Sequence, residues 1–97
     1  MKMYTNEFQT AKLIELRFKK PSSIASVEPI YGMGGISVAK AYTIGELIEM
    51  LDGVSELEIL REGSGWGVYD ELRAFSSEDL IDALYDMIVK LKEEGAI

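Results

Sequence analysis

Residues 12–19 alternate between apolar and polar side chains, a pattern typical of a half-buried β-strand. The apolar positions would share one face of this strand: Ile14, Leu16 and Phe18. Pro21 then interrupts the pattern, because proline has no backbone N–H and restricts the residue before it. We therefore predict an N-terminal strand within residues 1–21.

The next segment has the pattern of two strands joined by a glycine-rich turn. Residues 24–30 are weakly extended, and Pro29 restricts them to a sheet edge or a strand end. The glycines within residues 31–35 can adopt the positive φ angles that a tight reversal demands. Residues 36–42 then return as a second strand.

A capping box marks the start of a helix after residue 43. The Thr43 hydroxyl can accept a hydrogen bond from the backbone N–H of Glu46, and the Glu46 carboxylate can accept one from the backbone of Thr43. The apolar positions that follow share one helical face: Leu47, Ile48 and Leu51. Gly53 is suited to the left-handed residue that ends a helix.

The second half of the chain repeats this order of strands. Residues 56–61 have a strand pattern, residues 63–67 contain three glycines, and residues 68–74 form the returning strand. A strand follows each glycine segment, whereas phosphate-binding loops place a helix there. We therefore interpret both segments as hairpin turns.

The most strongly patterned element is the second helix. Ser76 is expected to cap it, with Asp79 in the capping-box position. Its apolar stripe recurs at helical spacing: Leu80, Leu84, Ile88 and Leu91. Gly95 should end it.

The two halves align with each other as a candidate internal repeat. Residues 22–54 align without a gap on residues 55–87, with identical or chemically similar residues at the capping, glycine and helix positions. One part does not correspond, because the apolar face of the first returning strand falls on mixed residues of the second: Ile36, Val38 and Tyr42 fall on Tyr69, Glu71 and Phe75. A sheet edge or a β-bulge would account for this mismatch.

These elements predict a single α+β domain over residues 1–97. The N-terminal strand occupies residues 1–21, and two β-hairpin–helix (ββα) units occupy residues 22–54 and 55–97. We expect a mostly antiparallel sheet with both helices on one face, because the apolar stripes of the helices need a surface to bury them.

The composition limits the chemistry that the chain can perform. Its 97 residues include neither cysteine nor histidine, which removes disulfides, thiolate nucleophiles, the commonest metal ligand and the usual general base. Carboxylate pairs one helical turn apart are usually a solvated face rather than a metal or acid–base site. We therefore expect no catalytic residue, no cofactor and no metal, and a non-enzymatic protein.

The net charge of −7 is unevenly distributed. Residues 1–20 carry a net charge of +3, which leaves −10 on residues 21–97. Such an acidic region disfavours direct binding to nucleic acid and to anionic membranes. The sequence also has no long apolar run and no secretory layout at residues 1–10, so we expect a cytoplasmic protein that does not engage membranes.

Two groups of residues are candidates for binding a partner. The first is aromatic and methionine side chains at the two turns, which suit interface anchors: Tyr31, Met33, Trp66 and Tyr69. The alternative for Trp66 is that it folds onto the core. The second group is acidic side chains of the two helices: Glu46, Glu49, Asp52, Glu78, Asp79, Asp82 and Asp86.

The favoured function is a small acidic protein-binding module. A sharper version is a phage or mobile-element inhibitor that mimics nucleic acid and blocks a partner with a basic nucleic-acid-binding groove. One alternative is a self-associating module, because the basic residues of the N-terminal segment can pair with the acidic region of a second copy in a homodimer. A less favoured alternative is a small-ligand-binding protein with a carboxylate-lined cleft.

Overall fold

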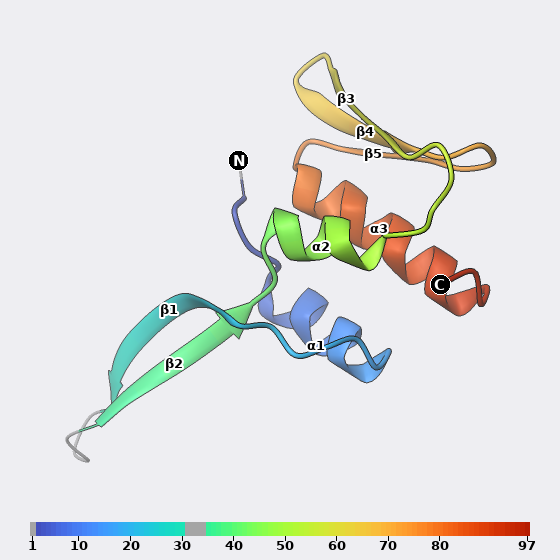
Figure 1. Cartoon of the computed structure of the whole chain (residues 1–97). Coiled ribbons are helices and arrows are strands. Elements are labelled where there is room, and N and C mark those ends of the chain that lie inside the picture. Colours follow the sequence, from blue (N-terminus) through green and yellow to red (C-terminus); the bar gives the residue numbers. More distant parts are fainter. Residues whose placement is uncertain (1, 31–34) are drawn as a thin grey trace.

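The computed structural model of the chain describes residues 2–30 and 35–97. Over these ranges it contains three helices and five strands (Figure 1). In chain order the elements are α1 (Glu7–Glu15), β1 (Ser23–Ile30), β2 (Gly35–Ala41), α2 (Ile44–Met50), β3 (Glu58–Glu62), β4 (Gly65–Tyr69), β5 (Ala74–Ser77) and α3 (Leu80–Glu93). The α+β class expected from the sequence is confirmed.

The strands form two separate antiparallel sheets rather than the single sheet that we expected. β1 pairs with β2, and β3–β4–β5 form a three-stranded sheet with β4 in the centre. The expectation was wrong because α3 alone buries its stripe against a sheet, whereas α2 packs against α3. A helix can bury its apolar face on another helix equally well.

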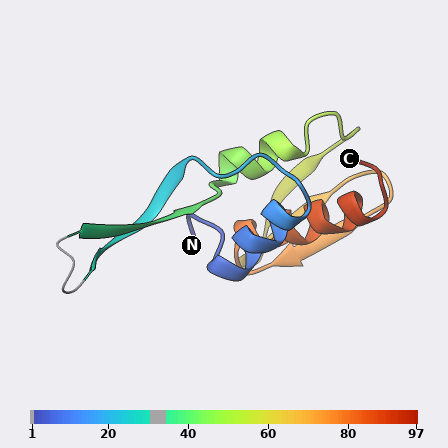
Figure 2. The same cartoon turned by 90° about the horizontal axis from the view of Figure 1, so that it is seen from below.

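The molecule consists of a packed body and a projecting arm. The body contains the three helices and the three-stranded sheet, and the β1–β2 hairpin extends away from it (Figures 1 and 2). The extents are 53 × 31 × 17 Å and the radius of gyration is 15.1 Å, above the about 12.5 Å typical of a compact domain of this length. The arm accounts for this elongated shape.

Helix α3 lies at the centre of the body. The expected stripe of Leu80, Leu84, Ile88 and Leu91 is buried. The three-stranded sheet packs on one side of α3, and α2 packs on another. The buried cluster also draws on α1, on α2 and its ends, on the sheet and on other α3 positions: Leu13, Tyr42, Leu47, Leu51, Val68, Ile81, Ala83 and Met87.

The predicted N-terminal strand is wrong, because residues 7–15 form helix α1. Asn6 and Gln9 make a capping box in which the Asn6 side-chain oxygen accepts from the Gln9 N–H at 2.7 Å and the Gln9 side-chain oxygen accepts from the Asn6 N–H at 3.0 Å. This cap starts a helix that continues into the alternating stretch, so residues 12–15 are helical instead of forming the predicted strand. Gln9, Thr10 and Leu13 are the buried residues of α1, and this i, i+1, i+4 spacing is helical rather than alternating.

Helix α1 ends at a left-handed residue, Arg17, with φ 71°. The N–H groups of Arg17 and Phe18 donate to the carbonyls of Ile14 and Leu13, which is a Schellman ending with arginine in the position that glycine usually takes. Phe18 packs against the core. The alternation of residues 12–19 therefore spans a helix end and the turn after it.

The capping box at Thr43 and Glu46 is confirmed, and α2 begins directly after Thr43. Gly53 has the expected positive φ, 89°, in the turn that follows the helix. The strands expected on either side of the first glycine segment are present as β1 and β2. The turn between them falls on residues 31–34, which lie outside the described ranges.

The second returning strand, expected over residues 68–74, is interrupted. β4 ends at Tyr69, a turn follows, and β5 begins at Ala74. The Asp70 carboxylate makes this turn, because it accepts from the backbone N–H groups of Leu72 at 2.8 Å and Arg73 at 2.6 Å. The turn explains why Tyr69, Glu71 and Phe75 do not present one face.

The predicted cap at Ser76 is also wrong. Ser76 belongs to β5, where it pairs with Gly67, and Asp79 is the residue that precedes α3. A cap at Ser76 would require the helix to begin at Ser77, but Ser76 and Ser77 are paired with β4 as part of the sheet. Gly95 ends the helix as predicted, with φ 77° and a hydrogen bond from the Ala96 N–H to the Leu91 carbonyl.

Candidate binding surface

The three-stranded sheet has one covered face and one open face. The register places Ile59, Val68 and Phe75 in one cross-strand row, and these three side chains pack toward α3 and the core. Residues alternate between the two faces of a strand. The neighbouring rows therefore point away from α3, on the side of the sheet that Figure 1 shows open.

We call this open side the outer sheet face. Its side chains come from all three strands: Glu58, Leu60 and Glu62 of β3, Tyr69 of β4, and Ala74 and Ser76 of β5. All except the half-buried Tyr69 are exposed. Leu60 is an exposed large hydrophobic residue, 47% accessible, at a position where side chains of a covered sheet would be buried. The face therefore combines a leucine and a tyrosine with two glutamates and no basic residue.

Tyr69 is held along the outer sheet face by Glu62. Its hydroxyl donates a hydrogen bond to the Glu62 carboxylate. This hydrogen bond, together with partial burial and the negative charge of Glu62, raises the pKa of Tyr69 above its ordinary value. The two side chains lie over Gly67, which is buried beneath them. The tyrosine therefore stays neutral and oriented on this face at physiological pH.

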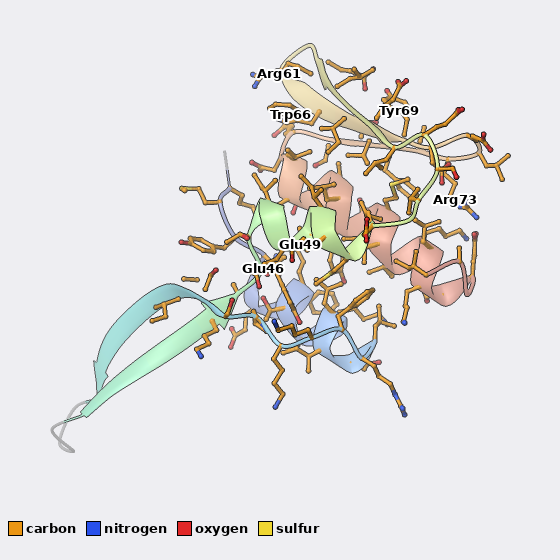
Figure 3. All side chains as sticks on the ribbon, in the orientation of Figure 1. Glu46, Glu49, Arg61, Trp66, Tyr69 and Arg73 are labelled. Atoms are coloured by element: carbon orange, nitrogen blue, oxygen red, sulfur yellow. The ribbon has the colours of Figure 1, made fainter. Side chains whose placement is uncertain are left out.

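Trp66 lies on the opposite face of the same strand. It is half-buried and packs against the core cluster, and the guanidinium of Arg61 lies 5.1 Å from its ring centroid. Figure 3 shows Trp66 on the α3 side of the sheet and Tyr69 on the other side. The interpretation of Trp66 as a residue folded onto the core matches this placement. The two aromatic candidates do not form one surface.

Trp66 instead lines a groove together with two of the acidic candidates, Glu78 and Asp79. A shallow groove at the end of the sheet is lined by Arg61, Ser64, Trp66, Glu78 and Asp79. The groove is polar and mixed in charge, because the Arg61 guanidinium shares it with two carboxylates. The other aromatic and methionine candidates, Tyr31 and Met33, lie outside the described residues.

The acids of α2 divide by role. Glu46 completes the capping box with Thr43 and also accepts from the Ser23 hydroxyl at 3.1 Å, so it joins α2 to the first residue of the arm. Glu49 and Asp52 are exposed. Two of the three candidates are therefore free to meet a partner, and the third is a structural residue.

The acids of α3 divide in the same way. Asp79 accepts from the backbone N–H of Lys2 at 2.8 Å, and Asp82 accepts from the Lys2 ammonium at 2.8 Å and from the Gln9 amide at 2.7 Å. Burial alone would raise the pKa of Asp82, but the hydrogen bonds from Lys2 and Gln9 and the charge of Lys2 outweigh it and lower the pKa. Both acids hold the N-terminal segment.

Glu78 and Asp86 are exposed. The pKa of Asp86 is raised by partial burial of the Asp86 carboxyl group, with a smaller contribution from the negative charge of Asp82. The unengaged acidic candidates therefore belong to two different elements: Glu49 and Asp52 at α2, and Glu78 and Asp86 at α3. The structure does not gather all seven predicted acids into one surface.

Sequence reasoning missed Glu58, Leu60 and Glu62 as site residues. Their alternation is visible in the sequence, but it does not show which face α3 covers. That assignment needs the register between β3 and β4, in which Leu60 pairs with Gly67 and Ile59 with Val68. No signal in the sequence distinguishes Leu60 from Ile59, so the structure alone identifies this face.

The described parts of the chain contain no group of three or more ligating side chains placed to hold a metal ion. Within the same ranges, no helix combines the length and the apolar character needed to cross a membrane. The chain matches no family model, no curated protein and no solved structure with which it was compared.

Proposed function

We propose that this protein is a small non-enzymatic binding module whose outer sheet face docks another protein. The observation that carries this proposal is Leu60, an exposed leucine set between Glu58 and Glu62 on a sheet face that no described helix covers. An apolar centre with a polar rim is the usual composition of a protein interface. We also place the protein in the cytoplasm, as part of the same proposal.

The partner that fits this face is a protein with an apolar patch rimmed by basic side chains. Glu58 and Glu62 flank Leu60 on the same strand, and no lysine or arginine lies on the face. Opposite charges around an apolar contact mainly raise the association rate and the specificity. Tyr69 adds an aromatic surface with a fixed hydroxyl, a side chain that is common at interface hot spots.

Two leucines make a matched test of this face. Leu60 lies on the outer sheet face, whereas Leu72, 83% exposed, lies in the turn between β4 and β5. Affinity capture with the wild-type protein, followed by mass spectrometry, first identifies a partner. The affinity of this partner for wild type, Leu60→Ser and Leu72→Ser is then measured by calorimetry. Circular dichroism and thermal melts check that both variants are folded.

We expect Leu60→Ser to weaken binding at least about tenfold, equivalent to about 1.4 kcal/mol, and Leu72→Ser to leave it unchanged. Double charge reversal of Glu58 and Glu62 to lysine should slow association most at low salt, because rim charges act on the rate of encounter. Equal affinity for wild type and the folded Leu60→Ser variant would rule out this face.

A second candidate function is nucleic-acid mimicry towards a protein with a basic groove. The observation that favours it is the exposure of Glu49, Asp52, Glu78 and Asp86. Reversal of these four charges, with Leu60 intact, separates the two functions. Mimicry requires that this variant loses binding, that binding is strongly salt-dependent, and that duplex nucleic acid competes with the protein for its partner.

A further inference from the structure

The β1–β2 arm is a hairpin with two open edges. In the described residues each of its strands pairs only with the other, and the arm projects from the body (Figures 1 and 2). An isolated two-stranded hairpin is marginally stable in water, and three or more strands, or packing on a helix, are normally needed. The arm therefore lacks the partner that would stabilise it.

The two edges differ in their ability to accept another strand. The edge of β1 is irregular, because its register shifts between Ile24 and Ser26 and because Pro29 has no N–H to donate. Bulges and prolines are the usual means by which natural proteins block an edge. β2 runs through Gly35–Ala41 with no proline, so its outward N–H and C=O groups form an uninterrupted row.

The charge of the arm permits contact with an identical arm. Between residues 22 and 42 the only charged residues are Glu28 and Lys40, so the arm is close to neutral. The whole chain has a net charge of −7, and two bodies would repel one another. A projecting, nearly neutral arm lets two copies meet at a distance from most of that charge.

An antiparallel strand edge is also complementary to itself. When two identical strands pair about a two-fold axis, each donor of one copy meets an acceptor of the other. We propose that two copies of this chain form a homodimer through antiparallel pairing of their β2 edges, which makes a four-stranded sheet in the order β1–β2–β2–β1. This interface is separate from the outer sheet face.

Wild-type protein gives the first test, which needs no substitution. Sedimentation equilibrium from low to high micromolar concentration should show a shift from the chain mass of 10.8 kDa towards twice that mass. Amide hydrogen exchange over the same range should show that alternate β2 amides, those that face away from β1, become protected as the dimer forms. A monomer at every concentration, or unchanged β2 exchange in a dimer, would overturn the proposal.

Adjacent proline variants give the second test. Successive residues of a strand direct their N–H groups to opposite edges, so Ala39→Pro and Lys40→Pro differ in which edge they block. The variant that blocks the outer edge should abolish the dimer, while circular dichroism remains that of the wild type. Persistence of the dimer in both variants would assign it to another surface.

Leu60→Ser separates this proposal from the proposed function, because it should leave the dimer mass unchanged. A monomeric wild type whose β2 amides become protected only when a different protein is added would also contradict the homodimer. In that case the arm would accept a strand from the partner instead.

Discussion

The ring of Tyr69 lies across Gly67, two residues earlier on strand β4 and on the same outer face of the sheet. A Cβ atom on Gly67 would collide with this ring and with the Glu62 carboxylate that accepts the Tyr69 hydrogen bond. The glycine therefore provides the space in which the tyrosine lies flat on the sheet.

Gly65 and Gly67 should respond differently to alanine. A Cβ atom on Gly65 would meet the backbone of Ser77 in β5, which cannot move without disturbing the sheet, whereas a Cβ atom on Gly67 meets only side chains. We expect Gly65→Ala to lower the free energy of unfolding by about 1–3 kcal/mol and Gly67→Ala to lower it less. Urea denaturation followed by Trp66 fluorescence measures both, and the reverse order would contradict the described packing.

Glu46→Ala should destabilise the protein, whereas Glu49→Ala should not. Glu46 accepts hydrogen bonds from the Thr43 N–H and from the Ser23 hydroxyl. Glu49, three residues later on the same helix, is exposed. Loss of a capping interaction costs about 1 kcal/mol, and an exposed substitution changes stability by less than about 0.5 kcal/mol. Denaturant midpoints compare the two variants, and equal midpoints would show that Glu46 has no structural role.

Asp70→Ala should destabilise the turn between β4 and β5. One carboxylate oxygen of Asp70 accepts from the N–H groups of both Leu72 and Arg73, and the other pairs with the Arg73 guanidinium at 3.2 Å. We expect a loss of about 1–2 kcal/mol on thermal or urea unfolding, because hydrogen bonds to a charged carboxylate are lost. Asp70→Asn is the matched control, because its side-chain oxygen retains the backbone hydrogen bonds, and it should lose less.

The interaction between Lys2 and Asp82 should stabilise the protein only while Asp82 is ionised. The pKa of Asp82 is lowered in the folded state, so the stabilisation is present above the unfolded pKa, about 3.9, and is lost as the pH falls through the folded pKa. Lys2→Met should lower the free energy of unfolding by about 0.5 kcal/mol at pH 7.

Urea titrations of wild type and Lys2→Met at a series of pH values test this expectation. The difference between the two proteins should shrink below the ordinary carboxyl pKa. Exposed Lys20 supplies the control, since Lys20→Met should show no such dependence on pH. A Lys2→Met difference that stays constant to low pH would indicate a contribution from packing rather than from charge.

Features with a local cause could be predicted from the sequence. Thr43 and Glu46 cap α2 because both partners of the capping box lie within one turn, and the stripe of α3 is buried because its spacing matches the helical repeat. Gly53 and Gly95 have the expected positive φ for the same local reason. The pattern that predicts each of these features lies within a few residues of it, so the prediction does not require knowing which segments far away in the chain pack against it.

The errors arose where two local patterns competed or where distant pairing decided the outcome. Residues 12–19 alternate like a strand, but the cap at Asn6 starts a helix that overlaps them. Ser76 resembles a cap, but its backbone pairs with Gly67 in the sheet. The apparent repeat hid a turn at Asp70, because a gapless alignment cannot represent a strand that ends early.

The candidate site divides in the same way. The sequence by itself determined the α+β class, the caps of α2 and the buried stripe of α3, because these follow from the periodicity and hydrogen-bonding capacity of neighbouring residues. Only the tertiary structure decided that Trp66 faces the core and Tyr69 the open side, that Asp79 and Asp82 hold the N-terminal segment, and that Leu60 is exposed. These outcomes depend on strand register and on contacts between residues far apart in the chain, and no local pattern specifies them.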